Sequence, residues 1–214
     1  MRDFLKRWRA PAKPVAAPDS PTVAPGEGIP FDGLTEEWRL AGRMMIAGRL
    51  SDVLNKREPI EIVDVRWAPV DGSAPFAPAA GLKSVDPYDL VLVLAGDATL
   101  PEMNQAERDA HKVHKVTYEV ALEVPPYRVI GTVQLYPGSE PDSLLSRSSE
   151  MFVPIIGATA TMGSMTVGSM TPSTILVNRQ YLRGVEQVDA RTGERYKKLP
   201  GQSMGGTNWT DRAR

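Results

Sequence analysis

His111 and His114 are the only histidines in the chain, and their type and spacing come nearest to metal chemistry. On a helix, a spacing of three would place both imidazoles on one face, where they could share a metal ion. Residues 111–124 instead alternate apolar and polar positions as a strand does, and a strand points residues three apart to opposite faces. Since the chain has no cysteine and no acid at matching ligand spacing, we expect no metal and no other cofactor.

Other catalytic patterns are sparse. No serine lies in a Gly-x-Ser-x-Gly elbow, and a Ser-His-Asp set would have to use one of the two histidines. Asp52 and Asp64 could face one cleft, but Asp52 is better explained as a helix cap and Asp64 as a turn former at a strand end. The chain also lacks a Walker A loop and a Gly-x-Gly-x-x-Gly turn after a strand. We therefore predict that the protein is not an enzyme.

Composition points to a cytoplasmic protein. The 214 residues carry a formal net charge of -1, which gives no overall attraction to nucleic acid or to anionic membranes. The absence of cysteine fits a reducing compartment. Pro11 and Pro14 interrupt the N-terminal segment before it reaches signal-peptide length, and no window approaches the roughly 20 apolar residues that cross a bilayer.

The N-terminal tip is the most pronounced amphipathic feature. Its apolar residues at helical spacing and the cations around them are Phe4, Leu5, Trp8, Arg2, Lys6, Arg7 and Arg9. Such a segment could dock in a groove of a partner protein, or residues 1–13 could contact an anionic membrane surface. The alternative is a frayed end, because an isolated helix this short is marginal in water. Residues 10–30 are a Pro/Ala-rich linker, so we expect residues 1–34 to be disordered.

The ordered part is organised around residues 44–65, which predict a strand, a short helical turn at 50–55 and a second strand from residue 60. A weaker copy lies about ninety residues on, at 127–133, 142–146 and 152–157. Thr35 could cap a helix, or residues 38–46 could form one long strand. Two copies of one unit predict a duplicated β protein.

The remaining segments predict more strands and two loops of interest. Residues 88–94 are apolar enough to be buried on both faces, and the long strand predicted at 111–124 has 127–135 as its partner. The long loop 68–87 has Phe76 as its large anchor. Residues 159–171 predict a Gly-rich hairpin or a mobile loop that exposes Met162, Met165 and Met170. Strands at 174–178 and 181–188 precede a polar tail, 191–214, in which Trp209 is the one large apolar handle.

The motif Leu50–Asn55 (LSDVLN), followed by a strand that ends Val63-Asp64-Val65, resembles a signature of small uncharacterised bacterial β domains. In that family an "LSDxLN" turn, a strand reading roughly "FLxLxDV" and a closing "VLVNRxxI" strand form one unit. The closing strand is similar to Ile175–Leu182 (ILVNRQYL). Ser146 replaces Asn55 in the second copy, Gly157 replaces Asp64, and the first copy lacks the Asn-Arg pair. The resemblance implies a small barrel that mediates binding, with no activity assigned to it.

These observations predict a mainly β protein with two related barrel-like (SH3/Sm-like) halves, 35–110 and 111–190, between disordered ends; a single mixed sheet is the alternative. The predicted function is a non-catalytic structural or adaptor subunit that binds other proteins, or itself, through the tip and the β core. For the core, the candidate contact residues are Phe76, Met162, Met165, Met170 and Trp209. A small-ligand or nucleic-acid-binding module is the alternative, although nucleic acid is disfavoured because the ordered region is acidic.

Overall fold

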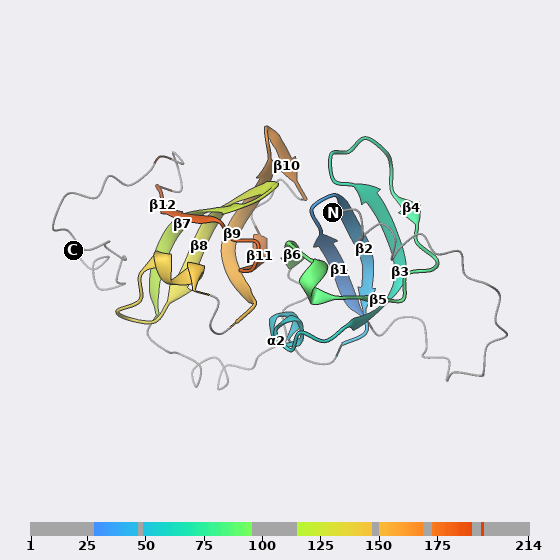
Figure 1. The fold of residues 1–214 in the computed structure, drawn as a ribbon, viewed down its shortest axis with the longest axis horizontal. Helices are drawn as coiled ribbons and strands as arrows, with labels where there is room; N and C mark the ends of the chain where they lie inside the picture. The colour runs from blue at the N-terminus through green and yellow to red at the C-terminus, as the bar shows by residue number, and fades with distance from the viewer. Residues whose placement is uncertain are drawn as a thin grey trace.

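The computed structural model describes residues 28–46, 49–95, 115–146, 150–168 and 173–189, together with Glu194. They form one continuous antiparallel sheet of twelve strands that is not closed into a barrel (Figure 1). The strands are β1 (Ile29–Leu34), β2 (Trp38–Met44), β3 (Ile60–Pro69), β4 (Ala77–Pro78), β5 (Ser84–Val85), β6 (Leu92–Ala95), β7 (Val116–Val124), β8 (Tyr127–Leu135), β9 (Phe152–Met162), β10 (Met165–Val167), β11 (Ser173–Asn178) and β12 (Gly184–Gln187). Helix α2 (Leu50–Asn55) and the 3-10 turns η1 (Pro87–Asp89) and η3 (Pro141–Leu145) connect them.

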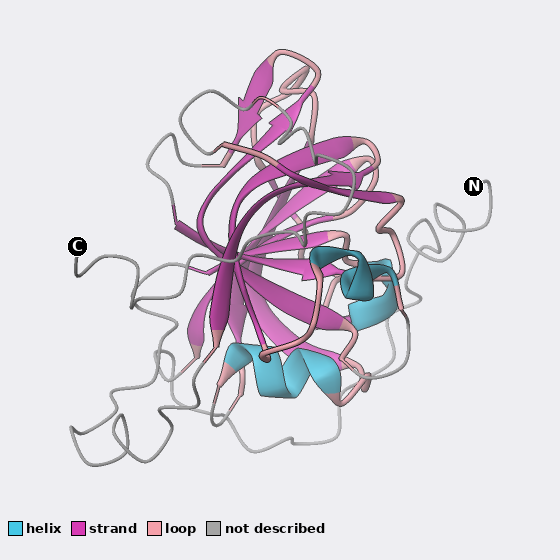
Figure 2. Ribbon diagram, turned by 90° about the vertical axis from the view of Figure 1, so that its left-hand side faces the viewer, coloured by secondary structure: helices cyan, strands magenta, loops and turns pink. Residues whose placement is uncertain are grey.

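The strand order is β12-β7-β8-β9-β11-β6-β1-β2-β3-β4, with β10 paired to β9 and β5 paired to β3. In Figure 2 the strands fan out from a common centre, which is the accumulated right-handed twist expected of an open sheet. The mainly β prediction is therefore confirmed.

The middle of the sheet separates two hydrophobic cores. On β11, Ile175 and Val177 point into one core and Leu176 into the other. On β6, Leu92 and Val93 divide in the same way, because successive side chains of a strand point to opposite faces. All of these side chains are buried, which confirms the prediction that the apolar run near residue 90 is covered on both faces.

Each core belongs mainly to one half of the chain, and the two halves are called here the first unit (28–95) and the second unit (115–189). The first unit contributes Leu34 and Leu92 to the core of the second unit. The second unit contributes Phe152 and Leu176 to the core of the first. Neither core is complete without residues from the other unit.

The two units share a strand order. In sheet order the second unit reads β12-β7-β8-β9-β11 and the first reads β6-β1-β2-β3-β4. In both, the last strand lies beside the first strand, and a three-strand meander follows. The seam between the units is the antiparallel pair of β11 and β6, with Leu176 opposite Val93.

Both units also carry a β-bulge at the same place, between their second and third meander strands. The register shifts at Gly42 of β2 and at Gly131 of β8. On the facing strands Asp64 has a φ of 54° and Gly157 a φ of 57°. A Cβ on Gly42 would lie 2.8 Å from the carbonyl oxygen of Val63, so the bulge needs a residue without a side chain opposite it.

The prediction of two barrel-like halves is wrong in one respect, and the single-sheet alternative is the one observed. A barrel would require the outer strands of each unit to pair with each other. Instead β6 uses its second edge to pair with β11 of the other unit. Both faces of these seam strands are apolar, so pairing them across the units buries surface that a separate barrel would leave exposed.

Several local predictions differ from the structure. Residues 29–34, expected to be disordered, form β1. Residues 38–44 form a strand, which was the alternative to a helix beginning at Thr35. The Thr35 hydroxyl caps a turn, accepting a hydrogen bond from the Trp38 amide at 2.9 Å. Asp52 is not a cap, because the N-cap of α2 is Arg49, which provides no side-chain bond. Asp64 is a bulge residue and not a turn former.

Other predictions are confirmed where the structure describes the chain. The helical turn at 50–55 and the pair of β7 with β8 are present. Residues 159–167 form the predicted hairpin through β9 and β10, with Gly163 at φ 59° in its turn. His111 and His114 lie outside the described residues, as do the N-terminal tip, Met170 and Trp209.

Candidate functional site

The most organised surface group in the described residues surrounds Phe76, and we call it the Phe76 surface: Phe76, Arg39, Arg66 and Asp32. Arg39 lies on β2, Arg66 lies on β3, and Phe76 immediately precedes β4. The guanidinium carbon of each arginine lies 5.7 Å from the centroid of the phenyl ring. The aromatic side chain, 38% exposed, is therefore held by two cation–π contacts.

Asp32 on β1 fixes one of these arginines in place. The Arg39 Nε donates to Oδ1 at 2.9 Å and its Nη2 to Oδ2 at 2.6 Å, so the pair is bidentate. The hydrogen bond to Asp32 raises the pKa of Arg39, burial opposes the rise, and the carboxylate charge adds to it. This fork geometry holds the Arg39 guanidinium in place beside the ring of Phe76.

A tryptophan pair supports the strands that carry this surface. The rings of Trp38 and Trp67 stack with centroids 4.6 Å apart and an angle of 30° between planes. Trp67 packs against the core of the first unit. Because Trp67 and Arg66 are adjacent on β3, they point to opposite faces, so the stack anchors the strand from the side opposite Arg66.

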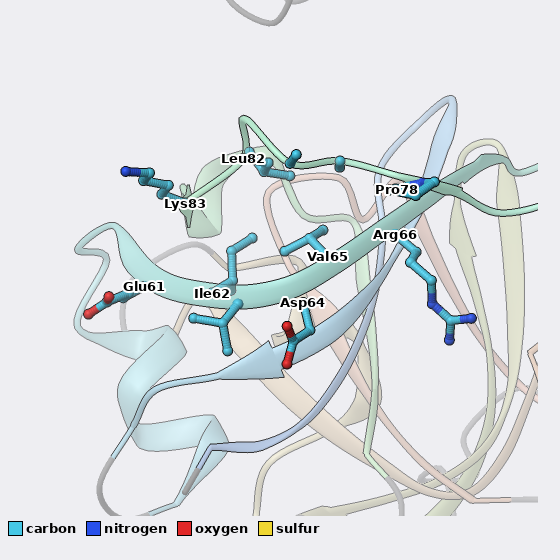
Figure 3. A pocket seen from close by; sticks show the side chains of 11 residues that line it. Glu61, Ile62, Asp64, Val65, Arg66, Pro78, Leu82 and Lys83 are labelled. Carbon is cyan, nitrogen blue, oxygen red and sulfur yellow. The ribbon is translucent and has the colours of Figure 1, made fainter. Parts of the chain in front are cut away.

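A hollow of about 590 Å³ adjoins the Phe76 surface and shares Arg66 with it. It lies between β3 and residues 78–83, where the backbone pairing of β3 is interrupted between β4 and β5 (Figure 3). In Figure 3, Val65 points toward the segment that carries Leu82, whereas Asp64 points to the other side of β3. The charged lining residues are Glu61, Asp64, Arg66 and Lys83. The lining is thus mixed in sign, and its carboxylates do not converge on one point.

The residues of the family-like pattern have structural contacts. The Asn55 side chain bridges α2 to β9, accepting from the Phe152 amide at 2.8 Å and donating to its carbonyl oxygen at 3.2 Å. The Asn178 side chain donates to the carbonyl oxygen of Leu90 at 2.8 Å and accepts from the amide of Gln180 at 3.0 Å. Both asparagines therefore connect the first unit to the second, a role that their sequence positions alone did not predict.

Arg179 is the one charged residue in the described part of the chain that is classed as buried, with 8% of its surface exposed. Its guanidinium donates to the carbonyl oxygens of Ser143 and Leu144 at 2.8 Å, and to that of Ser146. Burial lowers its pKa, and the negative charge of Glu150 opposes the shift. Arg179 thus holds the end of η3 against β11. The signal for this role was an arginine two residues after the apolar run 175–177.

The methionines of the predicted binding hairpin are not equivalent. Met162 packs against the core of the second unit, whereas Met165 is 37% exposed. Asp64 lines the hollow and Asp52 does not. The two carboxylates that the sequence analysis considered together therefore do not face one cleft. In the described ranges, no three His, Cys, Asp or Glu residues gather as metal ligands would.

Comparison of the chain with protein-family models, with curated proteins and with solved structures found no match. Among the helices that the structure describes, none has the length and apolar character needed to span a membrane.

Proposed function

We propose that the protein is a non-catalytic structural or adaptor subunit that binds another protein through the Phe76 surface. The observation that carries this proposal is the exposed ring of Phe76, held between two guanidinium groups of which one is fixed by Asp32. Aromatic residues and arginine dominate the energetics of protein interfaces. A ring that is already oriented loses little side-chain entropy on binding.

The geometry suggests the chemistry of the partner. An apolar side chain would pack on the outer part of the Phe76 ring, and a carboxylate of the partner would pair with the exposed Arg66. The N-terminal tip, with Phe4, Leu5 and Trp8 among four cations, would dock to a second partner or to the surface of a membrane in a cytoplasmic setting.

Affinity capture with the full-length protein tests the core surface. Tyr136 provides the matched control, because it is an aromatic residue of the second unit, 61% exposed, with the Lys115 ammonium 5.6 Å from its centroid. We expect Phe76→Ala to weaken capture of the partner about 30-fold, the loss typical of a central interface aromatic, and Tyr136→Ala to leave it unchanged. Equal capture by both variants would show that the Phe76 surface is not the interface.

The tip is tested separately. Trp8→Glu should abolish binding to anionic vesicles or to the tip's protein partner, while the melting temperature stays at its wild-type value. A large loss of stability would show that Trp8 belongs to the folded body.

A small-ligand-binding function is the second candidate, and the observation that favours it is the hollow between β3 and residues 78–83. Residues 78–83, within the 68–87 segment, form part of its wall. Chemical-shift perturbation in a screen of small anions and cations would test it. Shifts confined to Val65 and Leu82 would support the candidate, and no localised shift would reject it.

A further inference from the structure

The short strands outside each meander correspond between the two units. β5 pairs with the start of β3, at Ile60 and Glu61, and β4 pairs with its second half, at Arg66 and Trp67. In the second unit β11 likewise pairs with the start of β9, from Phe152 onward, and β10 pairs with its end. β5 therefore takes the place in the first unit that β11 takes in the second.

The turns after β5 and β11 support this correspondence. The Asp86 Oδ1 accepts a hydrogen bond from the Tyr88 amide at 3.0 Å. The Asn178 Oδ1 accepts one from the Gln180 amide, also at 3.0 Å and also two residues further on. Both are therefore Asx turns of the same kind. Aligning them matches the preceding residues in order: Val85 with Val177, Ser84 with Leu176, and Lys83 with Ile175.

In the second unit, the edge of β11 that faces away from β9 is occupied by β6. Leu176 of β11 lies opposite Val93 of β6. Two residues further on, the Asn178 amide donates to the Val91 carbonyl oxygen at 3.0 Å. Because bonded positions alternate along an antiparallel pair, Leu176 also turns its backbone groups toward β6. A unit of this architecture therefore accepts a further antiparallel strand at this edge.

The matching edge of β5, called here the β5 edge, carries no strand among the described residues. The Ile62 amide donates to the Lys83 carbonyl oxygen at 2.9 Å, so the backbone groups of Ser84, one residue on, point away from β3. Within the described ranges these two groups have no hydrogen-bond partner. β4 presents no equivalent edge, because the Ala79 amide donates to β3 at 2.8 Å and the outward position belongs to Pro78, which has no amide hydrogen.

The side chains of β5 indicate what this edge would bind. Val85 is buried in the core of the first unit, whereas Ser84 and Lys83 are exposed. The Lys83 side chain extends away from the hollow (Figure 3), and within the described ranges its ammonium group forms no ion pair. In the seam the position of Lys83 is held by Ile175, opposite Leu94. A lysine at this position instead favours an acidic residue on the opposite strand, since opposite charges form a favourable cross-strand pair.

We propose that the β5 edge binds an extended segment of a partner protein by strand addition. The backbone groups of Ser84 hydrogen-bond to the segment and supply affinity, while side chains supply specificity. The register of the seam places an apolar residue of the segment opposite Val85 and an acidic residue two positions later opposite Lys83. The β5 edge borders the start of β3, whereas the Phe76 surface includes Arg66 of its second half, and the inference does not rest on the function proposed for that surface.

A synthetic peptide tests the proposal in the full-length protein. The probe, Val-Leu-Val-Glu-Ala capped at both ends, follows the sequence of residues 91–95 with glutamate in place of Leu94. In the register of the seam, its leucine lies opposite Val85, its central valine opposite Ser84 and its glutamate opposite Lys83. We expect saturable chemical-shift changes in NMR spectra at the amides of Ser84 and Asp86, which both face outward. No change at Ser84 would overturn the proposal.

Methyl groups on the peptide backbone test the hydrogen bonds without altering the protein. The amide of the central valine faces Ser84, so N-methylation there removes a donor and should weaken binding about tenfold. The glutamate amide faces away from β5, so N-methylation there is the matched control and should leave the affinity unchanged. Equal binding of the two methylated peptides would show that the peptide does not add as a strand, and the proposal would be wrong.

A charge exchange tests the register. Lys83→Glu places two carboxylates opposite each other and should weaken binding of the glutamate peptide about fivefold. The same variant should bind a peptide with lysine in place of glutamate at the wild-type affinity. Failure of that peptide to restore binding would overturn the assignment of an acidic residue opposite Lys83. A Ser84 shift that depends on protein concentration without peptide would also overturn the proposal, because the edge would then bind a second copy of the chain.

Discussion

Asn55 provides the sharpest test of how the two units are joined. Its side chain makes two hydrogen bonds to the backbone of Phe152, at 2.8 and 3.2 Å, and so fixes α2 of the first unit to the start of β9 in the second. Asn55→Ala removes both bonds and leaves an amide and a carbonyl group of Phe152 without this partner. At about 1 kcal/mol for each bond, the free energy of unfolding should fall by about 2 kcal/mol.

The magnitude translates into a measurable shift. For a chain of this size, 2 kcal/mol lowers the melting temperature by about 6 °C. The matched control is Lys56→Ala, because Lys56 follows Asn55 at the end of the same helix and its side chain is exposed. Its free energy of unfolding should stay within about 0.5 kcal/mol of the wild-type value. Urea unfolding followed by far-ultraviolet circular dichroism measures both variants.

The same experiment tests whether the units unfold together. Trp38 and Trp67 lie in the first unit, so tryptophan fluorescence reports on that unit when Trp8 and Trp209 are replaced by phenylalanine, while circular dichroism reports on the whole sheet. Coincident midpoints are expected, because each core contains residues from the other unit. If Asn55→Ala matches Lys56→Ala, or if the two probes separate in the protein that carries only the Trp8 and Trp209 replacements, the reasoning about the seam is refuted.

Three further predictions concern single positions. Leu54 is fully buried in the core of the first unit, so Leu54→Asp should unfold it, and wild-type melting would contradict the packing. Asp64 has a positive φ, which costs a non-glycine residue free energy, so Asp64→Gly should leave the free energy of unfolding equal or raise it by up to about 1 kcal/mol. Gly42→Ala should lower it, because the new Cβ would meet the Val63 carbonyl oxygen. Chemical denaturation measures both variants. Burial raises the pKa of Tyr127, with the negative charge of Glu36 adding to the rise, and its hydroxyl donates to the Thr35 carbonyl oxygen. The folded state therefore keeps this proton to higher pH than the unfolded state, so the contribution of Tyr127 to stability is intact below about pH 10 and declines above it. Tyr127→Phe should make the fall of stability above about pH 10 less steep.

Strand patterns were readable from sequence because they depend on local alternation. Residues 111–124 and 127–135 were predicted as strands from their period of two. The structure has β7 over Val116–Val124 and β8 over Tyr127–Leu135, while residues 111–114 lie outside the described residues. Residues 90–94 contain no polar position, which correctly indicated burial on both faces for residues 90–93. These properties follow from side-chain geometry within one strand and need no knowledge of its neighbours.

The functional surface was only partly readable. Phe76 was recognised as the large residue of its loop, but Arg39 and Arg66 were not associated with it. Their proximity depends on the register of β2 with β3 and of β3 with β4, and neither spacing nor composition encodes that register.

By itself, the sequence determined the β class, the hairpins and the repeated strand, turn and strand pattern, since these arise from local alternation and turn chemistry. Tertiary structure alone decided that the units share one sheet. Pairing β6 with β11 buries both faces of two apolar strands at once, a gain available only when segments about eighty residues apart meet. It also decided the roles of Asn55, Asn178 and Arg179, because the backbone groups that these side chains bind belong to distant segments.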